Sequence, residues 1–336
     1  MANEIIDMHI HFGAPRDEQS GCYWSEKFEK TAAYWAMLLL TKSLFKKVDI
    51  NRVRKNLLDA VNGSKYVHKG VFLAMDQVYD ENGGVHPEQT HLHVPNHYLA
   101  DLAQQNPRVF WGASVHPYRN DWESELDYCL ENKAVLCKLI PSSQMFKPDH
   151  PKCTRLYQKL AEHNLPLLCH AGPEYAIPTS DETYNTYNNP KYLRTALDNG
   201  VTVIIAHCAL PYFWVFDTDY HDDYEDFLSL FDDAESHGWN LYADLSAFCT
   251  PSRAPYIDEI KRRIPANRLL FGSDYPVPLF ELSYNKSKNF FSWLRFIIKI
   301  AFTKNPLDKN YKLIEGMKFD NSVFTNASRL FELIRY

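Results

Sequence analysis

Short apolar runs recur along the chain and are separated by polar stretches. Eight of these runs are rich in valine, isoleucine and leucine, and near-continuous apolar runs are typical of parallel strands covered on both faces. We therefore predict strands at residues 5–12, 67–75, 109–115, 135–140, 166–170, 201–207, 241–245 and 269–272.

The stretches between these runs favour helices. Helix-compatible segments occupy residues 96–105, 122–132, 154–163, 191–199, 224–237 and 254–263. Strand and helix alternating eight times favour an α/β fold of the (β/α)8 TIM-barrel type over an open doubly wound sheet. A barrel of about 250 residues plus insertions accounts for the length. Because no linker or low-complexity tract interrupts the chain, we predict one domain over residues 1–336.

Two insertions are predicted, after strands one and eight. The first covers residues 14–64 and includes the apolar run 34–40; the second covers residues 276–319. Both leave from the C-terminal face, where barrel active sites lie, so a lid or a dimer contact would suit them. The apolar stretch 290–302 contains Arg295 and Lys299 and is too short to span a bilayer. We predict it to be an amphipathic helix on the outside of the barrel.

Composition narrows the class of protein and of partner. A hydrophobic fraction of 45% indicates a globular rather than a disordered chain. The net charge of −6, without a long basic run, argues against nucleic acid and anionic membranes as partners. Residues 1–4 leave no room for a signal peptide before the first strand, and seven cysteines then suggest reduced thiols. We therefore expect a cytoplasmic protein that binds a small-molecule substrate.

Side chains able to bind a metal ion stand at the ends of four predicted strands. His9 and His11 are two residues apart, so regular alternation places both on one face and Met8 and Ile10 on the other. His170 would add a third nitrogen, and Asp274 an oxygen. Such a set suits one catalytic zinc ion, with manganese, iron or cobalt as alternatives, and a bound ion activates water near neutral pH.

Three further ionisable residues are candidates at the site, and each has two interpretations. His207 ends strand six and either binds a second ion or stays free to polarise the substrate or carry a proton. Arg253 follows strand seven, where it would bind a substrate carboxylate or cap the next helix as a surface charge. His116 ends strand three, and its position leaves open whether it lines the site.

Several motifs in a fixed order carry a resemblance to a known family. The matching stretches are Ile-Asp-Met-His-Ile-His at 6–11, His-Ala-Gly at 170–172, Ala-His-Cys at 206–208, Phe-Gly-Ser-Asp-Tyr-Pro at 271–276 and Asn-Ala-Ser-Arg-Leu-Phe at 326–331. With them the sequence resembles the amidohydrolase superfamily, in the amidohydrolase-related branch that includes aminocarboxymuconate-semialdehyde decarboxylase. The matches span nearly the whole chain, and the insertion after strand one is its least family-like part.

The resemblance implies roles for individual residues. It implies that His9, His11, His170 and Asp274 hold the metal, that His207 is catalytic, and that Asp274 also accepts and returns a proton. In binuclear members of the superfamily a lysine on strand four is carboxylated and bridges two metals, whereas in this branch it is commonly unmodified. For Lys138 we favour one metal and an unmodified ammonium group near the substrate.

The function expected from these features is hydrolysis of a small amide, lactone or ester by metal-activated water, since the superfamily is mostly hydrolytic. The alternative is nonoxidative decarboxylation of an aromatic or unsaturated carboxylic acid, with Arg253 or Lys138 binding the carboxylate. A noncatalytic barrel would have a degraded ligand set, and this chain retains every expected ligand. A homodimer is compatible with the aromatic-rich insertions and with the frequent dimers among related enzymes.

Overall fold

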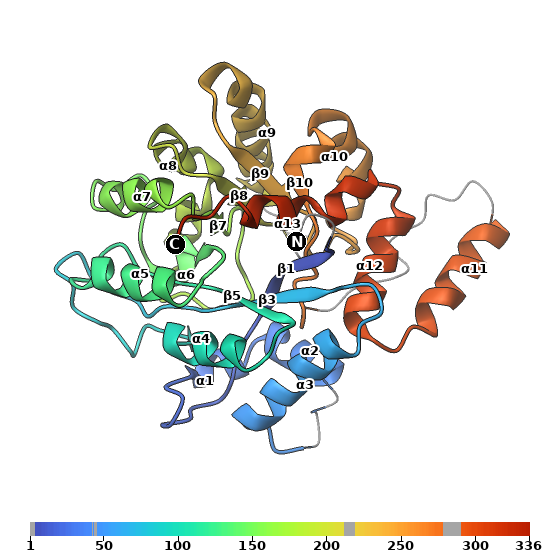
Figure 1. The fold of residues 1–336 in the computed structure, drawn as a ribbon, viewed down its shortest axis with the longest axis horizontal. Helices are drawn as coiled ribbons and strands as arrows, with labels where there is room; N and C mark the ends of the chain where they lie inside the picture. Colours follow the sequence, from blue (N-terminus) through green and yellow to red (C-terminus); the bar gives the residue numbers. More distant parts are fainter. Residues whose placement is uncertain (1–3, 42, 44–45, 212–218, 278–289) are drawn as a thin grey trace.

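Eight parallel strands stand at the centre of the molecule and a ring of helices surrounds them (Figure 1). The computed structural model describes residues 4–41, 43, 46–211, 219–277 and 290–336. The barrel strands are β1 (Ile6–His11), β3 (Lys69–Leu73), β5 (Val109–Gly112), β6 (Cys137–Leu139), β7 (Leu167–Cys169), β8 (Val203–Ile205), β9 (Leu241–Asp244) and β10 (Leu269–Leu270). Each strand lies within or close to a predicted run, so the predicted α/β barrel is confirmed.

Hydrogen bonds join the strands into a closed ring. The strands pair in the orders β1-β3-β5 and β6-β7-β8-β9-β10. Parallel bridges join Ala113 to Cys137 and Ile10 to Tyr275, so both edges of one sheet meet the edges of the other. Across the second junction, the backbone N–H of His11 donates to the carbonyl oxygen of Tyr275 at 2.8 Å. Closure brings the C-terminal ends of all eight strands to one opening.

The apolar side chains form an inner and an outer layer. Strand register aligns Lys138 with Leu168, Leu168 with Ile204, and Ile204 with Tyr242 across the barrel interior. Helix α13 (Asn326–Phe331) places Leu330 in the same interior cluster, so it closes the N-terminal end of the barrel. The opposite, C-terminal end is left for a functional site.

The surrounding helices include the six predicted segments, and two further helices, at residues 141–144 and 306–316, were not predicted. They are α4 (Asn96–Gln104), α5 (Trp122–Glu131), α6 (Pro141–Gln144), α7 (Cys153–Glu162), α8 (Arg194–Asp198), α9 (Asp219–His237), α10 (Ile257–Arg263) and α12 (Pro306–Gly316). The predicted helix 191–199 is a 3-10 turn followed by α8. All seven cysteines are buried, and none of them forms a disulfide. Among the described residues, no helix combines the length and the apolar character needed to cross a membrane.

The first insertion is shorter than predicted. Its last part is α3 (Ile50–Asn62), an amphipathic helix that buries Leu57 and Val61 in the outer layer and therefore belongs to the barrel ring. The remaining insertion contains β2 (Tyr23–Trp24), α1 (Glu26–Glu29) and α2 (Ala32–Leu40), and β2 pairs antiparallel with β4 (Leu92–His93). This pairing fixes the insertion to the loop that follows β3.

The second insertion contains the amphipathic helix expected at 290–302. This is α11 (Phe290–Ala301), which lies outermost at the right of Figure 1, with α12 between it and the barrel. Residues 278–289 of this insertion lie outside the described part of the chain.

Candidate active site

Strand β1 is irregular where it delivers its two histidines. Its register with β3 shifts between Asp7 and Ile10. Met8 packs in the interior cluster, while Ile10 belongs to the outer layer. The predicted placement of Met8 opposite His9 is therefore wrong, because a bulge-like irregularity interrupts the alternation of side chains. As a result His9 and His11 both reach the barrel mouth above Met8.

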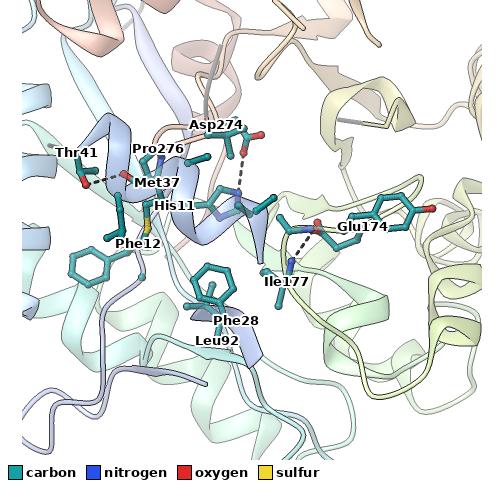
Figure 2. A pocket seen from close by; sticks show the side chains of 18 of the residues that line it. His11, Phe12, Phe28, Met37, Thr41, Leu92, Glu174, Ile177, Asp274 and Pro276 are labelled. Carbon is teal, nitrogen blue, oxygen red and sulfur yellow. Dashed lines mark hydrogen bonds and ion pairs between the residues drawn. The ribbon is translucent and has the colours of Figure 1, made fainter. Parts of the chain in front are cut away.

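Three predicted ligands converge at that mouth. The Nε2 atoms of His9 and His11 are 3.1 Å apart. Asp274 Oδ1 lies 3.0 Å from Nε2 of His11 and 3.5 Å from Nε2 of His9, and Figure 2 shows the contact with His11. One ligand atom from each of the three residues lies within 4.8 Å of the others. Asp274 is buried, but its contact with His11 and the charges of both histidines outweigh burial and hold its pKa below the ordinary value.

A second carboxylate, Asp244 at the end of β9, orients this group. Its Oδ2 accepts a hydrogen bond from Nδ1 of His9 at 2.8 Å, which leaves the Nε2 lone pair of His9 aimed at Asp274. Its Oδ1 accepts from the backbone N–H of His207 at 2.9 Å and from the N–H and hydroxyl of Ser246. Burial alone would raise the pKa of Asp244, but His9 and the donors around it hold that pKa below its usual range.

The sequence interpretation missed Asp244 and Ser246. Asp244 ends an apolar run in the same way as the predicted ligands, with Leu241, Tyr242 and Ala243 before it. That pattern was the available signal. None of the matching family motifs covers this strand.

His207 is held in a defined orientation and tautomer. It lies in a 3-10 turn that follows β8, with φ of 56°. Its Nδ1 is 3.3 Å from the carbonyl oxygen of Ser246 and 2.7 Å from the Ser246 hydroxyl. A carbonyl oxygen only accepts, so Nδ1 carries the proton, and the bare Nε2 lies 3.9 Å from Oδ2 of Asp274. Burial, followed by the charge of Arg253, holds the pKa of His207 well below its ordinary value, so the ring is neutral at pH 7.

His170 lies next to the converging group without belonging to it. Its ring centroid is 5.4 Å from that of His207, and its Nε2 is 3.4 Å from Oε2 of Glu174. Burial lowers the pKa of His170 to about 4, so it presents a neutral imidazole. Glu174, from the turn after β7, was not a predicted site residue, although it lines the cavity described below.

The donor set fits a divalent metal ion. Oδ1 of Asp274 and Nε2 of His170 are buried, and neither makes a well-formed hydrogen bond within the described part of the chain. Buried polar atoms are normally satisfied, so one unsatisfied atom within the converging group and another next to it are what a site able to hold a cation would present. Imidazole nitrogens with one carboxylate suit zinc, and the bond from His9 to Asp244 is the outer-shell support that metal-binding histidines commonly have.

Lys138 and Arg253 occupy different environments. Lys138 points into the barrel interior, fully buried, and its Nζ has no hydrogen-bond partner among the described residues. Burial lowers the pKa of this ammonium group. Arg253 is also buried and lines the cavity, donating to the carbonyl oxygens of Leu210 at 3.1 Å and Ser246 at 3.2 Å. Arg253 is therefore not an exposed helix cap.

A cavity of about 290 Å³ opens above the converging residues (Figure 2). Its barrel end is lined by His11, His170, His207, Arg253 and Asp274. The opposite wall comes largely from the first insertion, including α2. The site therefore combines a cluster of ligand-type side chains with a partly open cavity where a small molecule can be held against them.

His116 does not line this cavity. Its Nδ1 accepts from the backbone N–H of Tyr118 at 3.1 Å, and its Nε2 donates to the carbonyl oxygen of Gln144 at 2.8 Å. These bonds fix one neutral tautomer inside the protein, and burial lowers the pKa of His116 to about 3. The geometry is that of a structural histidine, so we leave His116 out of the function proposed below.

Replacing His116 by glutamine tests this structural role. Because the unfolded chain binds a proton at His116 near pH 6.5 and the folded protein resists it down to about pH 3, His116 makes the protein less stable as the pH falls through that window. We expect His116→Gln to lose roughly 1–3 kcal/mol at pH 7.5 from poorer hydrogen bonding, with a weaker pH dependence of unfolding. Urea unfolding at pH 7.5 and pH 5 measures the loss of stability and its pH dependence. Unchanged stability together with weakened ligand binding would instead place His116 in the site.

Comparisons with known proteins agree with this fold. A probable 2-pyrone-4,6-dicarboxylic acid hydrolase from Acinetobacter baumannii, with citric acid bound, aligns with a TM-score of 0.57 and 17% identity over 98% of this chain and 100% of that one. A 2,6-dihydroxybenzoate decarboxylase from Rhizobium aligns with a TM-score of 0.54 and 16% identity over 98% and 99%. An uncharacterised TIM-barrel protein from Bordetella bronchiseptica has the same TM-score and identity over 97% and 100%.

At these identities the solved structures establish the fold alone. A search among curated proteins found no match. The family comparison is more specific, because the model described as Amidohydrolase matches residues 6–296 and so covers β1 and the strand ends that carry the site. The chain therefore belongs to the Amidohydrolase family, within the amidohydrolase superfamily of enzymes.

Proposed function

We propose that this protein is a metal-dependent hydrolase that cleaves a small amide, lactone or ester with an activated water molecule. The observation that carries the proposal is the convergence of His9, His11 and Asp274 at the barrel mouth, with ligand atoms within 4.8 Å of one another. Family membership supports an enzyme with this type of site.

The proposed metal ligands are His9, His11, His170 and Asp274. Zinc suits this set best, and manganese, iron or cobalt are alternatives. A divalent ion bound here supplies Lewis acidity, which activates water at neutral pH and polarises a carbonyl group. We propose one ion and an unmodified Lys138, which lies in the barrel interior rather than in the cavity wall.

Proton transfer is assigned to His207 and Asp274. His207 is neutral with a bare Nε2, and that atom lies 3.9 Å from Oδ2 of Asp274. This pair accepts the proton of the attacking water and returns it to the leaving group. Ser246 holds the His207 ring in the tautomer that this role requires, and Asp244 accepts from the His207 backbone N–H.

Nonoxidative decarboxylation is the second candidate, and the position of Arg253 favours it. The buried guanidinium group lines the cavity beside His170 and His207, where a substrate carboxylate would find a cation. In that reaction the same proton-transfer residues would protonate the substrate carbon. Hydrolysis stays the leading proposal because the superfamily is mostly hydrolytic.

Metal removal and a pair of product assays separate these reactions. We expect the protein to bind one zinc ion per chain, to lose activity in a chelator, and to recover it when zinc is restored. The zinc-loaded protein is incubated with lactones and esters, followed by acid release, and with carboxylated arenes, followed by carbon dioxide release. Acid release supports hydrolysis and carbon dioxide supports decarboxylation. A protein that binds neither zinc nor manganese contradicts both.

A further inference from the structure

We propose that the substrate carries an apolar hydrocarbon group, an aliphatic chain or an aromatic ring, that fills the part of the cavity under α2 while its reacting group lies at the barrel mouth. This inference rests on the proposed function and narrows its substrate class. α2, a helix of the insertion after β1, is then the element that determines substrate specificity.

The first observation is that polarity in the cavity is divided between its two ends. The ionisable side chains are at the barrel end, from His11, His170, Glu174, His207, Arg253 and Asp274. The wall from the insertion and from α3 is neutral among the described lining residues, with Phe28, Met37 and Leu57 as its large apolar members. A charged or strongly polar group placed against that wall would lose water without gaining a partner. The cavity therefore suits a molecule with one polar and one apolar end.

The few polar groups in that wall are already bonded within the protein. The hydroxyl of Thr41 donates to the carbonyl oxygen of Met37 at 2.8 Å, and the hydroxyl of Ser43 accepts from Nε of Arg52 at 3.1 Å. Asn56 donates to the carbonyl oxygen of Thr41 at 3.3 Å. These groups bond within the insertion and between it and α3, so they do not make the wall a polar subsite.

The second observation is the way α2 presents its side chains. Ala33, Ala36 and Met37 have the spacing of one side of a helix and line the cavity, with Ala32 and Leu38 also in contact with it. Trp35 and Leu39 point away from it and are 54% and 63% exposed. Two alanines on the inner face leave the space that a larger residue would occupy. The helix therefore shapes a hollow on one face only.

The third observation is that this wall is firmly built. Thr31 caps α2 by accepting from the backbone N–H of Tyr34 at 3.1 Å. The Tyr34 ring packs edge-on against Trp24 and Phe28, with centroids 5.4 Å and 5.9 Å away. Trp24 belongs to β2, which β4 holds in place. A rigid apolar wall is the condition under which each buried carbon group adds a regular increment of affinity.

Binding of straight-chain carboxylates tests the inference without turnover. Butanoate, hexanoate, octanoate and decanoate are titrated calorimetrically into chelator-treated and zinc-loaded protein, with 4-phenylbutanoate as an aromatic arm. A carboxylate is a product of amide or ester hydrolysis and a substrate group in decarboxylation, so neither reaction is presupposed. We expect the affinity to rise about fourfold per added methylene until the cavity is filled. If the affinity rises only for the straight-chain carboxylates, the wall accepts an aliphatic chain. If it rises only for 4-phenylbutanoate, the wall accepts an aromatic ring.

Two tryptophan substitutions on one helix provide the matched control. Ala36→Trp should fill the hollow, so that the gain in affinity stops at a shorter chain, whereas Leu39→Trp on the exposed face should keep the full series. Ala33→Phe is a second cavity variant, and circular dichroism and melting temperature identify any variant that fails to fold.

The outcomes separate this inference from the function it rests on. The inference is overturned if, in the unaltered protein, the affinity does not rise with chain length and 4-phenylbutanoate binds no more tightly than butanoate. It is also overturned if the two tryptophan variants stop the rise in affinity at the same chain length. Zinc-dependent hydrolysis of short esters, together with an affinity that does not change with chain length, would support the proposed function and reject the apolar substrate. A rising series in a protein without hydrolytic or decarboxylating activity would support the apolar site and reject the function.

Discussion

Replacing Asp274 by asparagine is expected to lower kcat/KM by on the order of a thousandfold or more, because general acid–base catalysis alone contributes about 10²–10⁴. The substitution keeps the size of the side chain but removes the negative charge at Oδ1, which lies 3.0 Å from His11 Nε2. It also removes the proton acceptor at Oδ2, 3.9 Å from His207 Nε2. Both the proposed metal ligation and the proposed proton transfer depend on these two atoms.

Metal content and activity are measured together on the purified Asp274→Asn protein. Asp76→Asn is the matched control, since Asp76 is equally buried but pairs with Arg119 rather than with the site histidines. We expect the control to lose stability while keeping its zinc and its activity. An Asp274→Asn protein with a full complement of zinc and unaltered turnover would refute the role assigned to this carboxylate.

Replacing Asp244 by asparagine should weaken metal binding by roughly 10–100-fold, although Asp244 is not a proposed ligand. Asp244 is the acceptor that keeps the His9 proton on Nδ1. An amide has one oxygen, so it can accept either from His9 at the Oδ2 position or from His207 and Ser246 at the Oδ1 position, and its NH2 group faces the donors at the other position. We also expect the free energy of unfolding at pH 7 to fall by about 2–3 kcal/mol.

The stability loss in Asp244→Asn should depend on pH in a defined direction. The folded-state pKa of Asp244 lies below its unfolded value of 3.8, so its ionised form stabilises the protein above about pH 4, and this contribution disappears as the pH falls further. The difference between the two proteins should therefore be largest at neutral pH and shrink in acid. Zinc titration at pH 7 and urea unfolding at pH 7 and at about pH 2.5, below the unfolded-state pKa, measure these effects. A constant stability difference with normal zinc affinity would show that Asp244 does not orient His9.

The fold was predictable because its signals are local. An apolar run indicates a buried segment. The runs that end in His207 and His170 can each be recognised as strands from their own residues alone. α3 also has a local signal, the helical spacing of Leu57 and Val61, although the predicted insertion 14–64 included it.

The site was only partly predictable, because its details depend on contacts between distant strands. The predicted strand 109–115 leads to His116 as another leads to His170, yet β5 ends at Gly112, and His116 bonds to Gln144 outside the cavity. The position of a histidine at a strand end does not determine the direction of its ring or the groups that contact it. The bulge in β1 likewise arises from pairing with β3, so no alternation rule applied to residues 6–11 alone could place Met8 and His9 on the same side.

The sequence by itself determined the barrel, its family and the residue types able to bind a metal, since each follows from short patterns and motifs. Only the tertiary structure decided that Asp244 orients His9 and His207, and that α2 covers the site with an apolar wall. The physical reason is closure of the barrel. Bonds at both sheet junctions bring strands far apart in sequence to one opening, and distances of a few ångströms there depend on register and bulges that no single segment encodes.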